Sequence, residues 1–184
     1  MHLNAEEAVD FAADLAQRRA GALADAGRFE EALAVYDEEA RGYQARLSGL
    51  AGVRSDPHTA RRQGLHLGKV LMEMGSLHAR LRHAEPALAC TAEAVQILRG
   101  LGPADSVMAR YVLARVLWGF GWVRAGLDVE LLPALQAVQE AEGVLRALAP
   151  DPPAGLAPAV AADLPVLQAF LAHLQARCGP VQHP

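Results

Sequence analysis

A repeated segment constrains the fold of this chain more than any other feature of its sequence. Residues 86–101 read PALACTAEAVQILRGL and residues 133–148 read PALQAVQEAEGVLRAL, with eight identities in sixteen positions at an offset of 47 residues. A weaker third copy begins at Ala32 and requires one insertion. Self-similarity at a fixed period is typical of folds that stack one small structural unit on the next.

The repeated unit is predicted to be helical. In the segment 128–148 the residues Leu131, Leu135, Val138 and Leu145 are three, four or seven positions apart, as on one face of a helix. Aromatic residues make up only 5% of the chain and isoleucine occurs once, although 52% of the residues are hydrophobic. Such an aliphatic composition argues against a sheet, whose surfaces favour aromatic and β-branched residues.

Glycines and prolines divide the chain into seven expected helices, which cover residues 4–26, 29–47, 57–80, 84–99, 104–125, 128–148 and 163–177. We therefore predict an all-α protein of stacked antiparallel helical hairpins. Three hairpins are expected in residues 1–149, a proline-rich linker in 150–162, a C-terminal capping helix in 163–177 and a disordered tail in 178–184.

The first hairpin turn resembles a known family. Gly27, Phe29, Ala32 and Tyr36 follow the spacing of the turn and second helix of a tetratricopeptide repeat (TPR), in which a glycine, an aromatic, a small residue and a second aromatic recur. The glycine lets the chain reverse, and the small residue lets two helices approach closely.

The later copies match the resemblance less closely. Gly75 and Ala87 take the two small positions in the second hairpin, whose turn has no glycine, and Gly121 and Ala134 take them in the third at a spacing one residue longer. The period of 47 to 55 residues exceeds the TPR period of about 34 and approaches that of HEAT and armadillo repeats.

The resemblance implies a TPR-like α-solenoid that binds a peptide or a partner helix in a concave groove lined by the first helix of each hairpin. Carrying over the groove positions of the family gives a set of expected partner-binding residues in the first two hairpins: Asp14, Gln17, Asp25, Lys69, Met72, Ser76 and Arg80. The register of the third hairpin is ambiguous, so none of its residues is assigned.

Other classes of function find little support in the sequence. Phosphate-binding, nucleophile-elbow and zinc-protease motifs are absent, and the histidines lack the spacing of a helical metal pair. We therefore expect no enzyme activity, catalytic residue, metal or cofactor. A net charge of −4 argues against nucleic-acid binding. Three arginines interrupt the most apolar stretch, Val107 to Leu127, so a buried helix is favoured there over a membrane span.

The N-terminal residues lack the features of a signal peptide, so we expect a cytoplasmic protein. The preference for arginine over lysine, with abundant alanine and glycine, suggests a GC-rich bacterial source.

Two alternative functions remain open. Trp118 and Trp122 lie four residues apart, on one face of an expected helix. We favour a role in the core for them, but they would also suit a sensor of a small molecule or signal peptide. The apolar helix expected at 163–177 would either cap the stack or pair with a second copy to form a homodimer.

Overall fold

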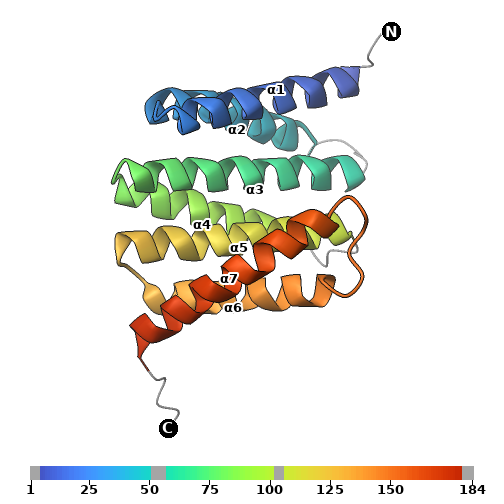
Figure 1. Cartoon of the computed structure of the whole chain (residues 1–184). Coiled ribbons are helices and arrows are strands. Elements are labelled where there is room, and N and C mark those ends of the chain that lie inside the picture. Colours follow the sequence, from blue (N-terminus) through green and yellow to red (C-terminus); the bar gives the residue numbers. More distant parts are fainter. Residues whose placement is uncertain (1–4, 51–56, 102–105, 180–184) are drawn as a thin grey trace.

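The computed structural model describes residues 5–50, 57–101 and 106–179, together with the side chains from residue 13 onward within these ranges. The described residues form seven α-helices and no strand, which confirms the prediction of an all-α protein with seven helices. The helices are α1 (Ala5–Asp25), α2 (Phe29–Leu50), α3 (Pro57–Arg80), α4 (Ala84–Gly100), α5 (Val107–Leu127), α6 (Leu131–Leu148) and α7 (Ala157–Cys178) (Figure 1).

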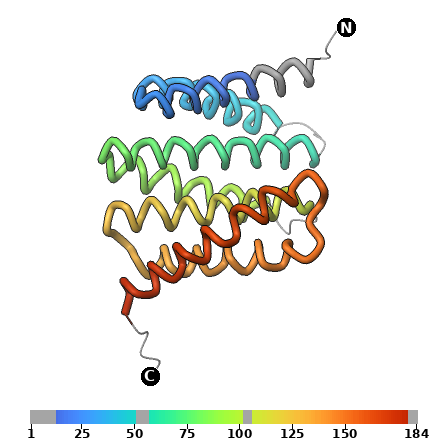
Figure 2. Tube along the Cα trace, in the orientation of Figure 1, coloured from blue at the N-terminus to red at the C-terminus, as the bar shows by residue number. Residues whose placement is uncertain are grey.

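Each helix packs against the next one in sequence and runs in the opposite direction (Figures 1 and 2). Helices α1, α3 and α5 lie in one row, and α2, α4 and α6 lie behind them. Within the front row, α3 packs directly against α5. The last helix, α7, packs on α6 and crosses the front of α5 obliquely.

The two copies of the repeat lie in matching surroundings. Their second residues, Ala87 and Ala134, are both fully buried. A Cβ atom on Gly75 would lie 3.1 Å from the carbonyl oxygen of Ala87, and one on Gly121 would lie 3.1 Å from that of Ala134. In both pairs the front helix thus approaches the back helix too closely for any residue but glycine, as expected for the small positions of the repeat.

The turns within the three helix pairs share one conformation. Each holds a residue in the left-handed region: Gly27 (φ 75°), Arg82 (φ 62°) and Asp128 (φ 58°). In each turn the amide of this residue bonds the carbonyl three residues back, and the next amide bonds the carbonyl five residues back. This Schellman arrangement ends all three front helices. The third turn has one more residue before its back helix, and Glu130 within it is also left-handed (φ 48°), which accounts for the longer spacing of the third copy.

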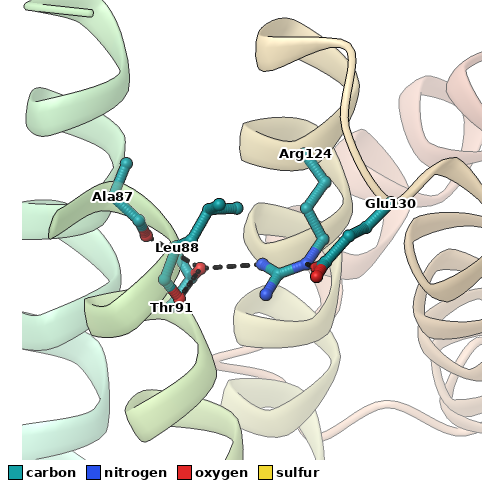
Figure 3. Close-up of polar contacts among 5 residues, drawn as sticks. All are labelled: Ala87, Leu88, Thr91, Arg124 and Glu130. Carbon is teal, nitrogen blue, oxygen red and sulfur yellow. Dashed lines mark hydrogen bonds and ion pairs between the residues drawn. The ribbon is translucent and has the colours of Figure 1, made fainter. Parts of the chain in front are cut away.

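A buried arginine joins the second helix pair to the third (Figure 3). Arg124 of α5 is only 4% exposed and donates hydrogen bonds to Thr91 Oγ1 of α4 (3.0 Å) and to Glu130 Oε2 (2.8 Å). Its guanidinium lies 3.4 Å from the ring centre of Phe120. The Thr91 hydroxyl in turn donates to the carbonyl of Ala87 (2.9 Å). The network fixes the position of α4 relative to α5.

The last helix begins earlier than predicted. We expected a linker through residue 162, but α7 starts at Ala157 because Leu156 and Val160 are buried and anchor its first turn. Pro165 lies inside the helix. Cys178, expected in the tail, is the last residue of α7, and the tail beyond residue 179 lies outside the described residues.

Candidate functional site

A pocket of about 570 Å³ lies between α3 and α5 on the front face. The two helices run in the same direction (Figure 1). Its lining from α3 is Lys69, Met72, Glu73, Ser76 and Arg80, and its lining from α5 is Met108, Tyr111, Val112, Arg115, Val116, Trp118, Gly119 and Trp122.

A second pocket of about 310 Å³ adjoins the first, on the side of α3 that faces α1. Its lining is Asp14, Gln17, Arg18, Tyr36, Lys69, Val70 and Glu73. Lys69 and Glu73 line both pockets and so form the boundary between them. We call the two pockets together the front groove.

The structure places six of the seven expected partner-binding residues along the front groove. Asp14 and Gln17 line its α1 side, Met72, Ser76 and Arg80 line its α5 side, and Lys69 lies between them. Asp25 is exposed at the end of α1 and lines neither pocket. The two front helices for which groove residues were expected thus contribute to one continuous surface.

The α5 wall carries exposed apolar side chains. Met108 is 50% exposed and Trp122 is 42% exposed, and both face the groove. Trp118 is partly buried against the core, and the Arg115 guanidinium lies 5.6 Å from its ring centre. Our preference for Trp122 as a core residue is therefore wrong. Its ring lies on the groove side of α5, where it faces the space between α3 and α5.

The α3 wall is mainly cationic. Lys69 and Arg80 form no ion pair within the described part of the chain, and the Arg80 guanidinium lies 5.7 Å from the ring centre of Phe29. Glu73 is the acidic residue between them. Burial by surrounding protein atoms raises the pKa of Glu73, whereas the positive charges of Arg115, Arg80 and Lys69 oppose that rise. Among the described residues of the α3 wall, the two positive charges of Lys69 and Arg80 therefore exceed the single negative charge of Glu73.

The cation on the α5 wall already has a carboxylate partner, which α7 supplies. Arg115 Nη1 donates to both oxygens of Asp163 at 3.0 Å, and the Tyr111 hydroxyl donates to Asp163 Oδ2 at 2.7 Å. Burial raises the pKa of the Tyr111 hydroxyl, and its hydrogen bond to the Asp163 carboxylate raises it further. The α5 side of the groove can thus hold a carboxylate between a guanidinium and a phenol.

Sequence reasoning named Trp118 and Trp122 only for the alternative sensor and assigned no partner-binding residue to the α5 wall, although the repeat contains the signal for it. The two close-approach glycines, Gly75 and Gly121, are 46 residues apart. The same offset takes Lys69 to Arg115 and Ser76 to Trp122, all of which line the groove. Aligning the copies on their glycines rather than on the PAL segments, which are 47 apart, would have found these residues.

A further crevice between α1 and α2 contains Glu39, which also lies outside the expected set. Both carboxylate oxygens of Glu39 are buried and have no hydrogen-bond partner within the described ranges. Burial raises the pKa of Glu39 to about 7, and the nearby positive charge of Arg46 only partly opposes it. This carboxyl group makes the first helix pair sensitive to pH.

Comparison with family models, with curated proteins and with solved structures finds no match to this chain. Among the described helices, α7 is long and apolar enough to cross a membrane by length and composition alone. That helix differs from the stretch that the sequence had singled out, Val107 to Leu127, which lies in α5.

Proposed function

We propose that this chain is a binding protein rather than an enzyme, and that it holds a peptide or a partner helix in the front groove. In this proposal the three helix pairs form a TPR-like α-solenoid, and the protein acts in the bacterial cytoplasm as an interaction module without a cofactor. The observation that carries the proposal is the composition of the groove. Exposed apolar side chains, Trp122 and Met108, lie opposite two cations, Lys69 and Arg80, that form no ion pair with the residues that the structure describes.

This combination suits a polypeptide ligand. Exposed aromatic and thioether side chains supply most of the binding energy at peptide and protein interfaces, and flanking charges supply specificity. The matching turns and close-approach glycines favour a repeat architecture, because each front helix then presents an equivalent row of residues to the groove.

Tryptophan fluorescence tests the proposal directly, because the only two tryptophans of the chain, Trp118 and Trp122, both line the groove. A random peptide library is selected on the purified protein, and tryptophan-free peptides from it are titrated while emission is recorded. We expect saturable binding that changes the emission. A selection that enriches no peptide, or enriched peptides that leave the emission unchanged, would contradict the proposed site.

A matched pair of variants distinguishes binding in the groove from non-specific binding to exposed apolar side chains. Trp122→Ala removes a 42% exposed side chain from the groove, and Leu132→Ala removes a 55% exposed side chain from α6, outside it. Calorimetry should show affinity at least about tenfold weaker for Trp122→Ala, as for a central aromatic contact. Leu132→Ala should bind as the unmodified chain does.

A small-molecule sensor is the second candidate. The pocket between α3 and α5, about 570 Å³, falls within the range of about 300–1,000 Å³ usual for small-ligand sites. The same fluorescence titration, run with a panel of small aromatic and anionic compounds, distinguishes a small-molecule sensor from a peptide-binding protein. Saturation by a small compound, together with failure of all peptides, would favour the sensor.

Self-association through α7 is the third candidate. Leu167 and Leu174 are fully buried within the protein, whereas Val166 is 56% exposed. Leu164, Phe170 and Leu171 are only partly buried, so packing within one chain covers part of the apolar side of α7 and leaves part of it exposed. Sedimentation at micromolar concentration tests this candidate, since a monomer there would exclude a stable homodimer.

A further inference from the structure

The charges of the front groove point to the chemistry of its partner, an inference that rests on the function proposed above. We propose that the front groove binds an acidic peptide segment, with two carboxylates that pair with Lys69 and Arg80 and an apolar side chain between them that packs on Trp122.

The first argument is the balance of charge. Ion pairs within the protein already neutralise Arg18 with Asp14 and Arg115 with Asp163. Three charged groups of α3 line the groove, of which Lys69 and Arg80 are positive and Glu73 is negative. Glu73 can offset only one of the two cations, so a neutral or basic segment that displaced water from the groove would leave positive charge in excess, and such uncompensated charge weakens binding.

The second argument is that the residue equivalent to Lys69 in the next helix pair already binds a carboxylate. At the offset of 46 residues that separates Gly75 from Gly121, Lys69 corresponds to Arg115. Arg115 holds a carboxylate, that of Asp163, which comes from outside its own helix pair. Lys69 stands in the same place on the preceding pair and has no such partner in the described chain. The α7 contact is therefore an internal example of the pairing that an acidic ligand would make at Lys69.

The geometry also fixes an approximate spacing for the ligand. Lys69 and Arg80 are eleven residues apart on one helix, which corresponds to about 16 Å at a rise of about 1.5 Å per residue. An extended peptide covers that distance in about five residues, at about 3.3 Å each. The α1 side of the groove carries Asp14, so the acidic residues of the ligand should lie towards α3 and α5.

The test uses synthetic peptides and the full chain. One peptide has two glutamates five positions apart with a phenylalanine between them; in a second peptide both glutamates are glutamine, and in a third both are lysine. Calorimetry measures each against the unmodified chain, Lys69→Glu, Arg80→Glu and the control Arg110→Glu. Arg110 is an exposed arginine of α5 that does not line the groove.

We expect the glutamate peptide to bind at least about tenfold more tightly than the glutamine peptide, with affinity that falls as salt is added. Lys69→Glu and Arg80→Glu should each weaken it by about tenfold, whereas Arg110→Glu should change it less than about twofold. The lysine peptide should bind Lys69→Glu more tightly than it binds the unmodified chain, because one of the two repelling cations is then a carboxylate.

Two different results overturn the inference, and they can be told apart. If the glutamine or lysine peptide binds the unmodified chain as tightly as the glutamate peptide and changes tryptophan emission, the groove binds peptides but not acidic ones. If library selection and all three peptides give no binding, the proposed function fails together with the inference. Circular dichroism of each variant excludes loss of folding as the cause.

Discussion

Gly75→Ala is the substitution for which the structure predicts the clearest effect on stability. The new methyl group would lie 2.4 Å from Thr91 Cγ2 and 3.1 Å from the carbonyl oxygen of Ala87. Ordinary carbon–carbon contacts are about 3.5–4.0 Å, so an overlap of about 1 Å must be relieved. Thr91 cannot rotate away freely, since its hydroxyl bonds two carbonyls and accepts a bond from Arg124. Helices α3 and α4 must therefore separate.

The expected cost follows from two opposing effects. Overpacking of a rigid contact costs about 3 kcal/mol, at the upper end of the usual range because backbone atoms are involved. Alanine recovers about 1 kcal/mol through its higher helix propensity. The net loss of about 2 kcal/mol corresponds to a melting temperature lower by about 4–8 °C for a chain of this size.

Thermal and urea unfolding measure this loss, and two further variants test its cause. Gly143→Ala places a methyl group on α6 where no atom lies within 4 Å, so it should raise stability by about 1 kcal/mol. Thr91→Ser removes the clashing methyl but keeps the hydroxyl, so it should reduce the cost of Gly75→Ala in the double variant. Stabilisation by Gly75→Ala, or no rescue by Thr91→Ser, would refute the close approach of α3 to α4.

Three more predictions concern other parts of the structure. Arg82→Gly should raise the free energy of unfolding by about 1 kcal/mol, since a left-handed conformation (φ 62°) strains any residue with a Cβ. Urea unfolding measures the gain, and Arg110→Gly, at a right-handed helical position, is the control. Arg124→Ala should lower the free energy of unfolding by about 2 kcal/mol, because Thr91 and Glu130 lose their buried hydrogen-bond partner and Phe120 loses the guanidinium stacked on its ring. A loss below about 0.5 kcal/mol in thermal unfolding would contradict the network. Burial raises the pKa of Glu39 to about 7 in the folded chain, against about 4.3 when unfolded, so its contribution to stability is complete below about pH 4.3 and is lost as pH rises to 7. Glu39→Gln should therefore raise the melting temperature by about 2–4 °C at pH 8 and have a smaller effect at pH 5, and an equal effect at both pH values would contradict a raised pKa.

Much of the fold could be predicted because helix periodicity and the position of glycine and proline are local signals. Those signals located α2, α3 and α6 to within three residues at each end. The small positions Gly75 and Gly121 were also predictable, since close helix approach selects for a residue without a side chain.

Other features depend on contacts that no local pattern reports. The turn at Arg82 lacks the usual glycine, yet it takes the same left-handed conformation as Gly27, because the packing of α3 on α4 outweighs local preference. The early start of α7 depends on burial of Leu156 and Val160. Proline-rich composition alone predicts a linker there.

The candidate site was predictable on one side only. The residues of α3 were implied by the resemblance to the tetratricopeptide repeat, whereas Trp122 was assigned to the core because tryptophan on an apolar helix is more often buried. Its exposure results from the space between α3 and α5, which is a property of the packed helices. The pairing of Arg115 with Asp163 joins residues 48 positions apart and could not be found from spacing.

Chemical-shift mapping of the backbone amides with the bound glutamate peptide tests the central claim most directly. We predict that the perturbed amides cluster on α3 between Lys69 and Arg80 and on α5 between Met108 and Trp122, with little change on α2, α4 and α6. Perturbations concentrated on the back row, or on the outer side of α7, would show that the front groove is not where this protein binds its partner.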